Sequence, residues 1–210
     1  SGKTICGPVI ASAIEKALKM GESNACMKRI VAAPTAGACG VVPAVYLTLQ
    51  EQRQIDDERM LEAMYIASGV GGVIANRAFL AGAAGGCQAE IGSASSMAAA
   101  GAVYLAGGDT EAIIHAAAMA MKNLLGLACD PVAGLVEVPC VKRNVVGAVN
   151  ALSAADMALA GVRSIIPPDE VFDAMRSVGI SLPEAIRETG KGGLAATTTG
   201  QKIAQGLQHE

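Results

Sequence analysis

The sequence predicts an all-α protein, a compact bundle of buried helices rich in alanine and glycine. The chain has 210 residues and is 52% hydrophobic but only 2% aromatic, with no Trp. Its core must therefore consist mainly of small and aliphatic side chains, which let helices pack backbone close to backbone. No useful length alternates apolar and polar residues as a half-buried strand does. This length also predicts a single domain over 1–210.

The first helix is predicted over 8–28. Val9, Ala13, Ala17 and Met20 recur at helical spacing, and charged residues occupy the opposite side. Residues at this spacing lie on one face, so these four are expected to face the core.

A loop at 29–40, marked by Pro34, separates this helix from a second one at 41–53. The carboxylates at 56–58 suit the N-terminus of a third helix, which runs to about Asn76.

The third helix contains Ser68-Gly69-Val70-Gly71-Gly72. Each glycine costs roughly 1 kcal/mol relative to alanine inside a helix. Either the helix breaks there, or another backbone approaches too closely for a side chain.

Two helices follow, at 92–107 and at 110–125, the second beginning behind an Asp109 cap. The segment 110–125 is apolar on nearly every face, which predicts that it is the central helix. The uncharged run at 91–108 is at the lower limit for a membrane span. Because it lacks flanking aromatic and basic residues, it is interpreted as a fully buried helix, and no membrane association is expected.

The remainder is predicted as a helix at 144–161, a second after Pro167-Pro168-Asp169, a short one near Pro183, and a tail rich in Gly and Thr. Functional loops are expected at about 29–40, 82–91 and 126–143.

Charge and targeting signals narrow the class of protein. The net charge is -3, and the one basic cluster, Lys142-Arg143, is small. Nucleic-acid binding requires a concentrated basic face, so none is expected. The absence of a signal peptide in this sequence predicts a cytoplasmic protein.

Two apparent phosphate-binding motifs are interpreted as decoys. Ser1-Gly2-Lys3-Thr4 matches the end of a P-loop but has no strand before it, and Gly190-Lys191-Gly192-Gly193 fits a turn. Of the two histidines, His115 is expected to be a satisfied core or interface residue, and His209 lies in the terminus.

Six cysteines remain, and in a reducing compartment they are ligands, catalytic groups or buried apolar residues. Cys6 and Cys26 are expected in the core, and Cys39 is expected to be structural. The other three, Cys87, Cys129 and Cys140, lie in segments rich in Gly and Pro that can present thiolates to a cluster. Their separations of 42 and 11 residues match no ferredoxin or zinc ribbon, so a three-thiolate site and purely structural cysteines both stay open.

Whole segments decide between these alternatives. They closely resemble the α chain, or α domain, of the iron–sulfur-dependent bacterial L-serine dehydratases, and the resemblance runs from Ser1 to Gly193-Leu194-Ala195-Ala196-Thr197. The segments are Ala33-Pro34-Thr35-Ala36-Gly37, Gly86-Cys87-Gln88-Ala89-Glu90-Ile91-Gly92 and the ungapped stretch from Asn123 to Cys140.

The resemblance implies a [4Fe–4S] cluster held by Cys87, Cys129 and Cys140, with one iron left open as a Lewis acid. It implies the elimination of the hydroxyl of L-serine to give pyruvate and ammonia, without pyridoxal phosphate. It also implies a β chain or β domain as partner, and an oligomer. Relative to the family, this chain is expected to be the catalytic α domain without further upstream segments.

The same resemblance nominates helper residues but no catalytic base. Thr35 and Gly37 could donate hydrogen bonds to the substrate carboxylate, or could simply form a helix-entry loop. Asn76, Gln88 and Glu90 could bind the substrate or orient the cluster, although Glu90 could also cap the next helix. The alternative function is a helical assembly domain with structural or zinc-binding cysteines and no catalysis.

Overall fold

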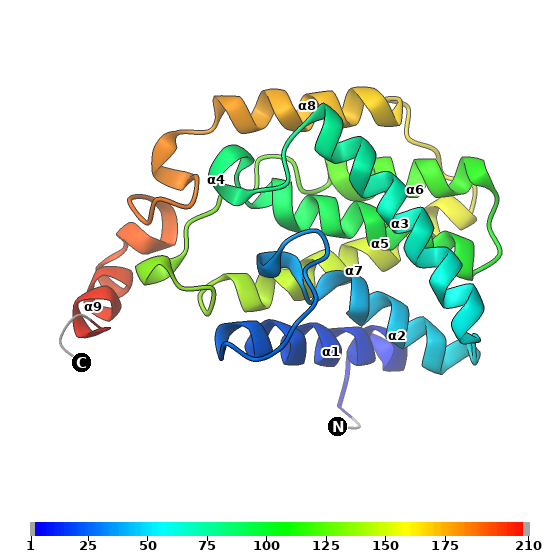
Figure 1. The fold of residues 1–210 in the computed structure, drawn as a ribbon, viewed down its shortest axis with the longest axis horizontal. Helices are drawn as coiled ribbons and strands as arrows, with labels where there is room; N and C mark the ends of the chain where they lie inside the picture. The colour runs from blue at the N-terminus through cyan, green and yellow to red at the C-terminus, as the bar shows by residue number, and fades with distance from the viewer. Residues whose placement is uncertain (1–2, 208–210) are drawn as a thin grey trace.

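The computed structural model describes residues 3–207 and confirms an all-α fold (Figure 1). The described part of the chain has no β-strand, and its only β-type pairing is an isolated bridge between Cys129 and Arg187. The α-helices are α1 (Gly7–Ala25), α2 (Val41–Arg53), α3 (Asp57–Arg77), α4 (Gly82–Gly85), α5 (Ser93–Leu105), α6 (Thr110–Lys122), α7 (Cys140–Leu159), α8 (Pro168–Ser181) and α9 (Thr198–Leu207).

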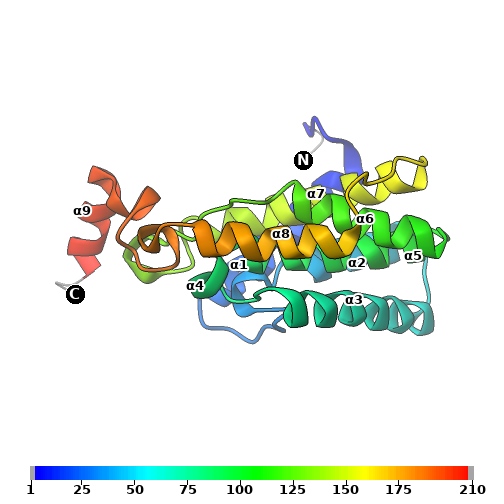
Figure 2. The ribbon, with the colours of Figure 1, turned by 90° about the horizontal axis from the view of Figure 1, so that it is seen from above.

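Helix α5 is the centre of the bundle, in contact with α2, α3, α6 and α7. The two views show it enclosed by these neighbours (Figures 1 and 2). Nearly all of its residues are buried, as predicted for the run at 91–108. The prediction that 110–125 forms the central helix is wrong, because α6 exposes Thr110, Glu111 and Ile114 on one side.

Close helix packing depends on missing side chains at a few glycines. A Cβ on Gly101 of α5 would lie 1.7 Å from the Tyr46 hydroxyl oxygen, which itself donates a hydrogen bond of 3.1 Å to the carbonyl of Ala63. Helix α2 therefore packs directly on the backbone of α5.

Helix α3 continues unbroken through 68–72, so the first interpretation of its glycines is wrong. Only Gly71 meets a close neighbour: a Cβ there would lie 3.0 Å from the sulfur of Met97. That neighbour is a side chain rather than a backbone, and Gly69 and Gly72 have nothing within 4 Å of an added Cβ.

Both predicted acidic caps are present. The Asp56 carboxylate accepts from the backbone N–H of Arg59 at 2.8 Å, and the Asp109 carboxylate accepts from that of Ala112 at the same distance. Such caps each stabilise a helix by about 1 kcal/mol.

Helix α1 begins one residue earlier and ends three residues earlier than the predicted 8–28. Its buried face consists of Ala13, Ala17 and Gly21. Val9, expected in that face, is 36% exposed. Cys6 and Cys26 are also exposed, contrary to the prediction. They are the residues just outside the two ends of α1, beyond the stretch that the helix buries.

The segments expected to be loops are more ordered than predicted. Residues 82–91 contain the short α4 and most of a π-helical turn, Gln88–Gly92, that leads into α5. The 126–143 loop ends at Pro139, because α7 begins at Cys140. The Gly/Thr-rich tail forms α9, which projects from one end of the bundle (Figures 1 and 2).

Among residues 3–207, the structure contains no helix with both the length and the apolar character needed to span a membrane. Part of the Ser1–Thr4 motif, and the whole of His209, lie outside the described residues.

Candidate functional site

Three separate segments hold the cysteines that the sequence singled out. Cys87 lies between α4 and the π-helical turn, Cys129 lies in the extended segment after α6, and Cys140 is the first residue of α7. All three side chains are buried, with exposed fractions of 1%, 2% and 6%. The Cys87 and Cys129 thiols are close enough for each to shift the pKa of the other.

Gly86 explains the position of Cys87. Its φ of +76° is unfavourable for other residues, and a Cβ there would lie 2.6 Å from a methyl of Leu182 and 2.9 Å from the carbonyl of Leu127. The chain can therefore turn tightly, and the backbone N–H of Gln88 donates to the same Leu127 carbonyl at 3.2 Å. This contact brings the Cys87 turn against the segment that carries Cys129.

Cys129 is held by backbone hydrogen bonds on both sides. Its N–H donates to Ile186 at 2.8 Å, and its carbonyl accepts from the N–H of Glu188 at 2.7 Å. Residues 186–188 thus become part of the site, although they are far from Cys129 in the sequence.

Thr35, Gly37 and Glu90, all nominated from the sequence, lie together. The Thr35 hydroxyl donates to the Glu90 carboxylate at 2.7 Å. A Cβ on Gly37 would lie 2.9 Å from the other carboxylate oxygen of Glu90. The segment at 35–37 therefore fixes Glu90, and Glu90 does not serve as a helix cap, because the π-helical turn runs directly into α5.

Gly82 lies close to one thiol and two carboxylates of the candidate site. A Cβ on this residue would lie 2.9 Å from the Cys129 sulfur, 3.1 Å from Oε2 of Glu90 and 3.3 Å from Oε2 of Glu188. The absence of a side chain at Gly82 leaves room for this thiol and these two carboxylates.

Gln88 positions the site without facing it. Its side chain is fully buried, donates to the carbonyls of Gly85 and Met175, and accepts from the N–H of Gly126. It thereby fastens the Cys87 turn to α8 and to the 126–131 segment. Asn76, by contrast, lies on the exposed side of α3 and forms no side-chain hydrogen bond with any residue in 3–207.

Arg143 and Asp130 form an ion pair beside the thiols that the sequence did not predict. The Arg143 guanidinium lies 2.8 Å from the Asp130 carboxylate and donates to the carbonyl of Ala128 at 2.7 Å. The other Asp130 oxygen accepts from the N–H of Leu194. The sequence shows an Asp directly after Cys129 and an Arg one helical turn after Cys140, but only the tertiary structure shows that these two residues form an ion pair.

The electrostatic environment distinguishes the three thiols. The hydrogen bond from Cys129 lowers the pKa of Cys87 despite burial, and the positive charge of Arg143 acts in the same direction. That hydrogen bond, together with burial, raises the pKa of Cys129. Burial raises the pKa of Cys140 to about 12. Cys87 is therefore the thiol of this pair that loses a proton first.

Burial also raises the pKa of Glu90, although the Thr35 hydroxyl opposes this effect, and the negative charge of Glu188 adds to it. A carboxylate that is buried beside a second carboxylate is destabilised in its charged form. The Glu90 carboxyl therefore keeps its proton to a higher pH than an exposed carboxyl does.

The cysteine and carboxylate side chains of the candidate site suit a single metal ion and an iron–sulfur cluster to different degrees. Within residues 3–207, no set of three or more His, Cys, Asp or Glu side chains is arranged to bind one metal ion. An iron–sulfur cluster makes a different demand, because each of its thiolates binds a different iron and the thiolates do not converge on one point. Three buried cysteines on three segments, next to Arg143, fit such a cluster in number and chemistry.

The Asp130–Arg143 pair supports a prediction about stability. Replacing Asp130 with Ala leaves a mostly buried guanidinium without its partner, and removing one member of a buried pair costs about 3 kcal/mol. We expect this loss in the free energy of unfolding, measured by urea denaturation of the metal-free chain. Glu184→Ala is the control, because the Glu184–Lys191 pair is exposed and such pairs contribute less than about 1 kcal/mol. Equal losses in the two variants would contradict the prediction.

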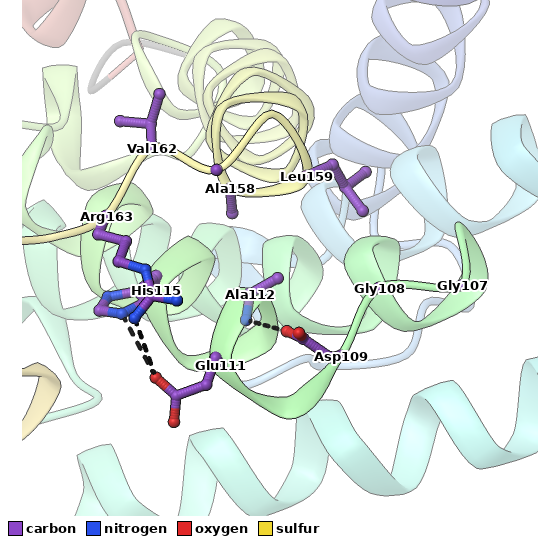
Figure 3. A pocket seen from close by; sticks show the side chains of 11 residues that line it. Gly107, Gly108, Asp109, Glu111, Ala112, His115, Ala158, Leu159, Val162 and Arg163 are labelled. Atoms are coloured by element: carbon purple, nitrogen blue, oxygen red, sulfur yellow. Dashed lines mark hydrogen bonds and ion pairs between the residues drawn. The ribbon is translucent and has the colours of Figure 1, made fainter.

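His115 lies away from this site, in a hollow of about 430 Å³ between the start of α6 and the end of α7 (Figure 3). Its ring nitrogen Nδ1 accepts from the N–H of Ser164 at 3.2 Å, and Nε2 is 3.7 Å from Glu111. His115 was expected to be a satisfied core or interface residue, but it is only half-buried, and one of its two ring nitrogens has a hydrogen bond. Helix α7, with Cys140 at its other end, is about 30 Å long, so His115 is remote from the thiols.

The fold and the site together define an all-α protein with a buried, cysteine-centred site assembled at the ends of its helices. Residues 1–195 match the family described as serine dehydratase alpha chain. The chain belongs to this family, as its sequence segments indicated.

Curated relatives agree with this assignment. The chain is 56% identical over 203 residues to a probable L-serine dehydratase alpha chain of Bacillus subtilis, covering 97% of this chain and 68% of that protein. It is 50% identical over 210 residues to the L-serine dehydratase alpha chain of Peptoniphilus asaccharolyticus, covering 100% of this chain and 72% of that protein. It is also 43% identical to L-serine dehydratase TdcG of Escherichia coli, covering 85% of this chain but only 40% of that protein.

Proposed function

We propose that this chain is the catalytic α chain or α domain of a cytoplasmic L-serine dehydratase, which converts L-serine to pyruvate and ammonia. The observation that carries the proposal is the burial of Cys87, Cys129 and Cys140, with the Cys129 sulfur and a carboxylate oxygen of Glu90 both close to Gly82, in a family whose relatives are named for this reaction. A β chain or β domain is the expected partner, because several of these relatives are named as alpha chains.

Cys87, Cys129 and Cys140 would hold a [4Fe–4S] cluster. When bound by only three thiolates, such a cluster supplies a Lewis-acidic iron that can bind the substrate and make its hydroxyl a better leaving group.

The residues of the chain contribute positioning and charge. Arg143 lies close enough to Cys87 to favour its thiolate, and Arg143 is itself fixed by Asp130 and by the carbonyl of Ala128. Burial of the three cysteines limits the access of water and oxidants to them. Gln88 holds the surrounding segments in register through three hydrogen bonds.

Glu90 presents one carboxylate oxygen to the space at Gly82, while Thr35 binds the other. This arrangement gives Thr35 and Gly37 a role in orienting Glu90, which differs from direct binding of the substrate carboxylate. The assembly-domain alternative has less support, because a structural zinc site requires four ligands around one ion and the described residues provide no such group.

Anaerobic reconstitution tests the proposal. Incubation of the chain with ferrous iron and sulfide, with and without its β chain, should give broad visible absorbance, about four irons per chain and formation of pyruvate from L-serine. A preparation with the full iron content that forms no pyruvate, even with the β chain, would contradict the function. Stoichiometric zinc with no visible band would support the assembly-domain alternative.

A further inference from the structure

Helix α3 has an outer face that no other part of the described chain covers. Figure 2 shows α3 along one edge of the bundle, and its inner side packs on α5. Tyr65, on the outer face, is 70% exposed. The exposed residues that form this outer face are Leu61, Met64, Tyr65, Ser68, Gly69, Gly72, Val73 and Asn76. None of them is charged, and a helix that is apolar or small on nearly every side is normally buried. The outer face therefore indicates a contact with another molecule.

Two glycines in the middle of the outer face are not explained by packing within the chain. Nothing lies within 4 Å of a Cβ added to Gly69 or Gly72, and neither has a positive φ. A glycine inside a helix nevertheless destabilises it relative to alanine. The sequence left open that another backbone approaches these glycines, and none does so among residues 3–207. Their lack of side chains lets a second helix pack at a short interaxial distance.

The outer face is complementary to itself when two copies of α3 run antiparallel. Its midpoint lies between Ser68 and Gly69, and a two-fold axis there is the symmetry of an isologous dimer. Tyr65 and Gly72 are equally far from that midpoint, so Tyr65 of one copy lies opposite Gly72 of the other. The largest side chain of the face thus meets a position without a side chain, and it does so twice in each dimer.

The charges of α3 favour the same orientation. Antiparallel helices place the positive end of each macrodipole beside the negative end of the other. The acidic first turn of α3, with Asp57 and Glu58, then lies near the basic last turn, with Arg77. Glu62, beside the outer face, accepts a hydrogen bond from Tyr104 of its own chain. Its two copies lie about 20 Å apart in the antiparallel pair, which is beyond the screening length of about 8 Å.

We infer that the outer face of α3 binds the same face of a second copy of this chain, in an antiparallel dimer with two-fold symmetry. The inference does not depend on the proposed reaction. The face is about 24 Å long and about 10 Å wide, which is smaller than the roughly 800 Å² that each partner buries in a standard interface. The dimer is therefore expected to exchange with monomer at micromolar concentrations.

Sedimentation velocity of the chain, alone and mixed with its β chain, over about 1–100 µM tests the inference. The wild-type chain alone should shift from monomer to dimer across this range. Gly72→Leu should raise the dissociation constant at least about 30-fold, because the new side chain occupies the position of Tyr65 twice in each dimer. The variant should still fold, since nothing in the chain lies within 4 Å of a Cβ at this position and leucine is the better helix former.

A double variant, Gly72→Leu with Tyr65→Ala, tests the register of the two helices. It exchanges the large and the small residue, so it should recover most of the association that Gly72→Leu loses. Gly206→Leu is the matched control, because Gly206 is also inside a helix and has nothing within 4 Å of an added Cβ. This control should associate as the wild type does.

Four results would overturn the inference. They are a wild-type chain that stays monomeric up to about 100 µM, wild-type association in Gly72→Leu, an equal loss of association in Gly206→Leu, and no recovery in the double variant. A wild-type chain that is monomeric alone, but whose binding to the β chain is lost in Gly72→Leu, would assign the outer face of α3 to the β chain instead.

Discussion

Replacing Cys129 with Ser is expected to abolish iron incorporation and leave the helical bundle folded. Cys129 lies in the extended segment outside the helices, and its two backbone hydrogen bonds, to Ile186 and from Glu188, do not involve the sulfur. A serine hydroxyl is a poor substitute for a thiolate toward iron. The expected result is loss of the visible band and of bound iron, with a far-ultraviolet circular dichroism spectrum close to that of the wild type.

Cys26→Ser is the matched control, because Cys26 is exposed at the end of α1. Its reconstituted iron content should equal that of the wild type. Full iron content in Cys129→Ser would contradict the assignment of this ligand. Loss of helical structure in Cys129→Ser would mean instead that the 126–139 segment is required for folding.

Replacing Gly101 with Ala is expected to lower the free energy of unfolding by about 4 kcal/mol. The new methyl group would lie 1.7 Å from the Tyr46 hydroxyl oxygen, at a fully buried position on the central helix. Tyr46 would have to move, losing its hydrogen bond to Ala63. Overpacking costs about 1–3 kcal/mol, and an unsatisfied buried polar group costs about 1–3 kcal/mol more.

Gly69→Ala provides the contrast for this measurement. Gly69 is inside α3, and nothing lies within 4 Å of an added Cβ, so the variant should gain up to about 1 kcal/mol from helix propensity. Urea denaturation of the metal-free variants checks both values. A Gly101→Ala variant as stable as the wild type would show that α2 and α5 are not packed as closely as described.

Local sequence signals predicted most of the fold. Apolar residues at helical spacing, and carboxylates such as Asp56 and Asp109, located the helices, because capping depends on neighbouring atoms in the chain. The resemblance also selected Cys87, Cys129 and Cys140, and the structure buries all three side chains.

Other features needed the tertiary structure. Hydropathy assigned the central position to 110–125 rather than to α5, because composition does not show which small-residue helix the others enclose. Cys6 and Cys26 were expected in the core, but a cysteine at the end of a helix is buried only if another element covers it.

The sequence by itself determined the helical class and the positions of most helices and nominated the cysteines of the candidate site, since these depend on periodicity, capping and short motifs. Only the tertiary structure decided that Glu188 lies beside Cys129, that Arg143 pairs with Asp130, and that Gly82 leaves space for two carboxylates. The physical reason is that these contacts join segments distant in the chain, and their geometry depends on how the helices pack.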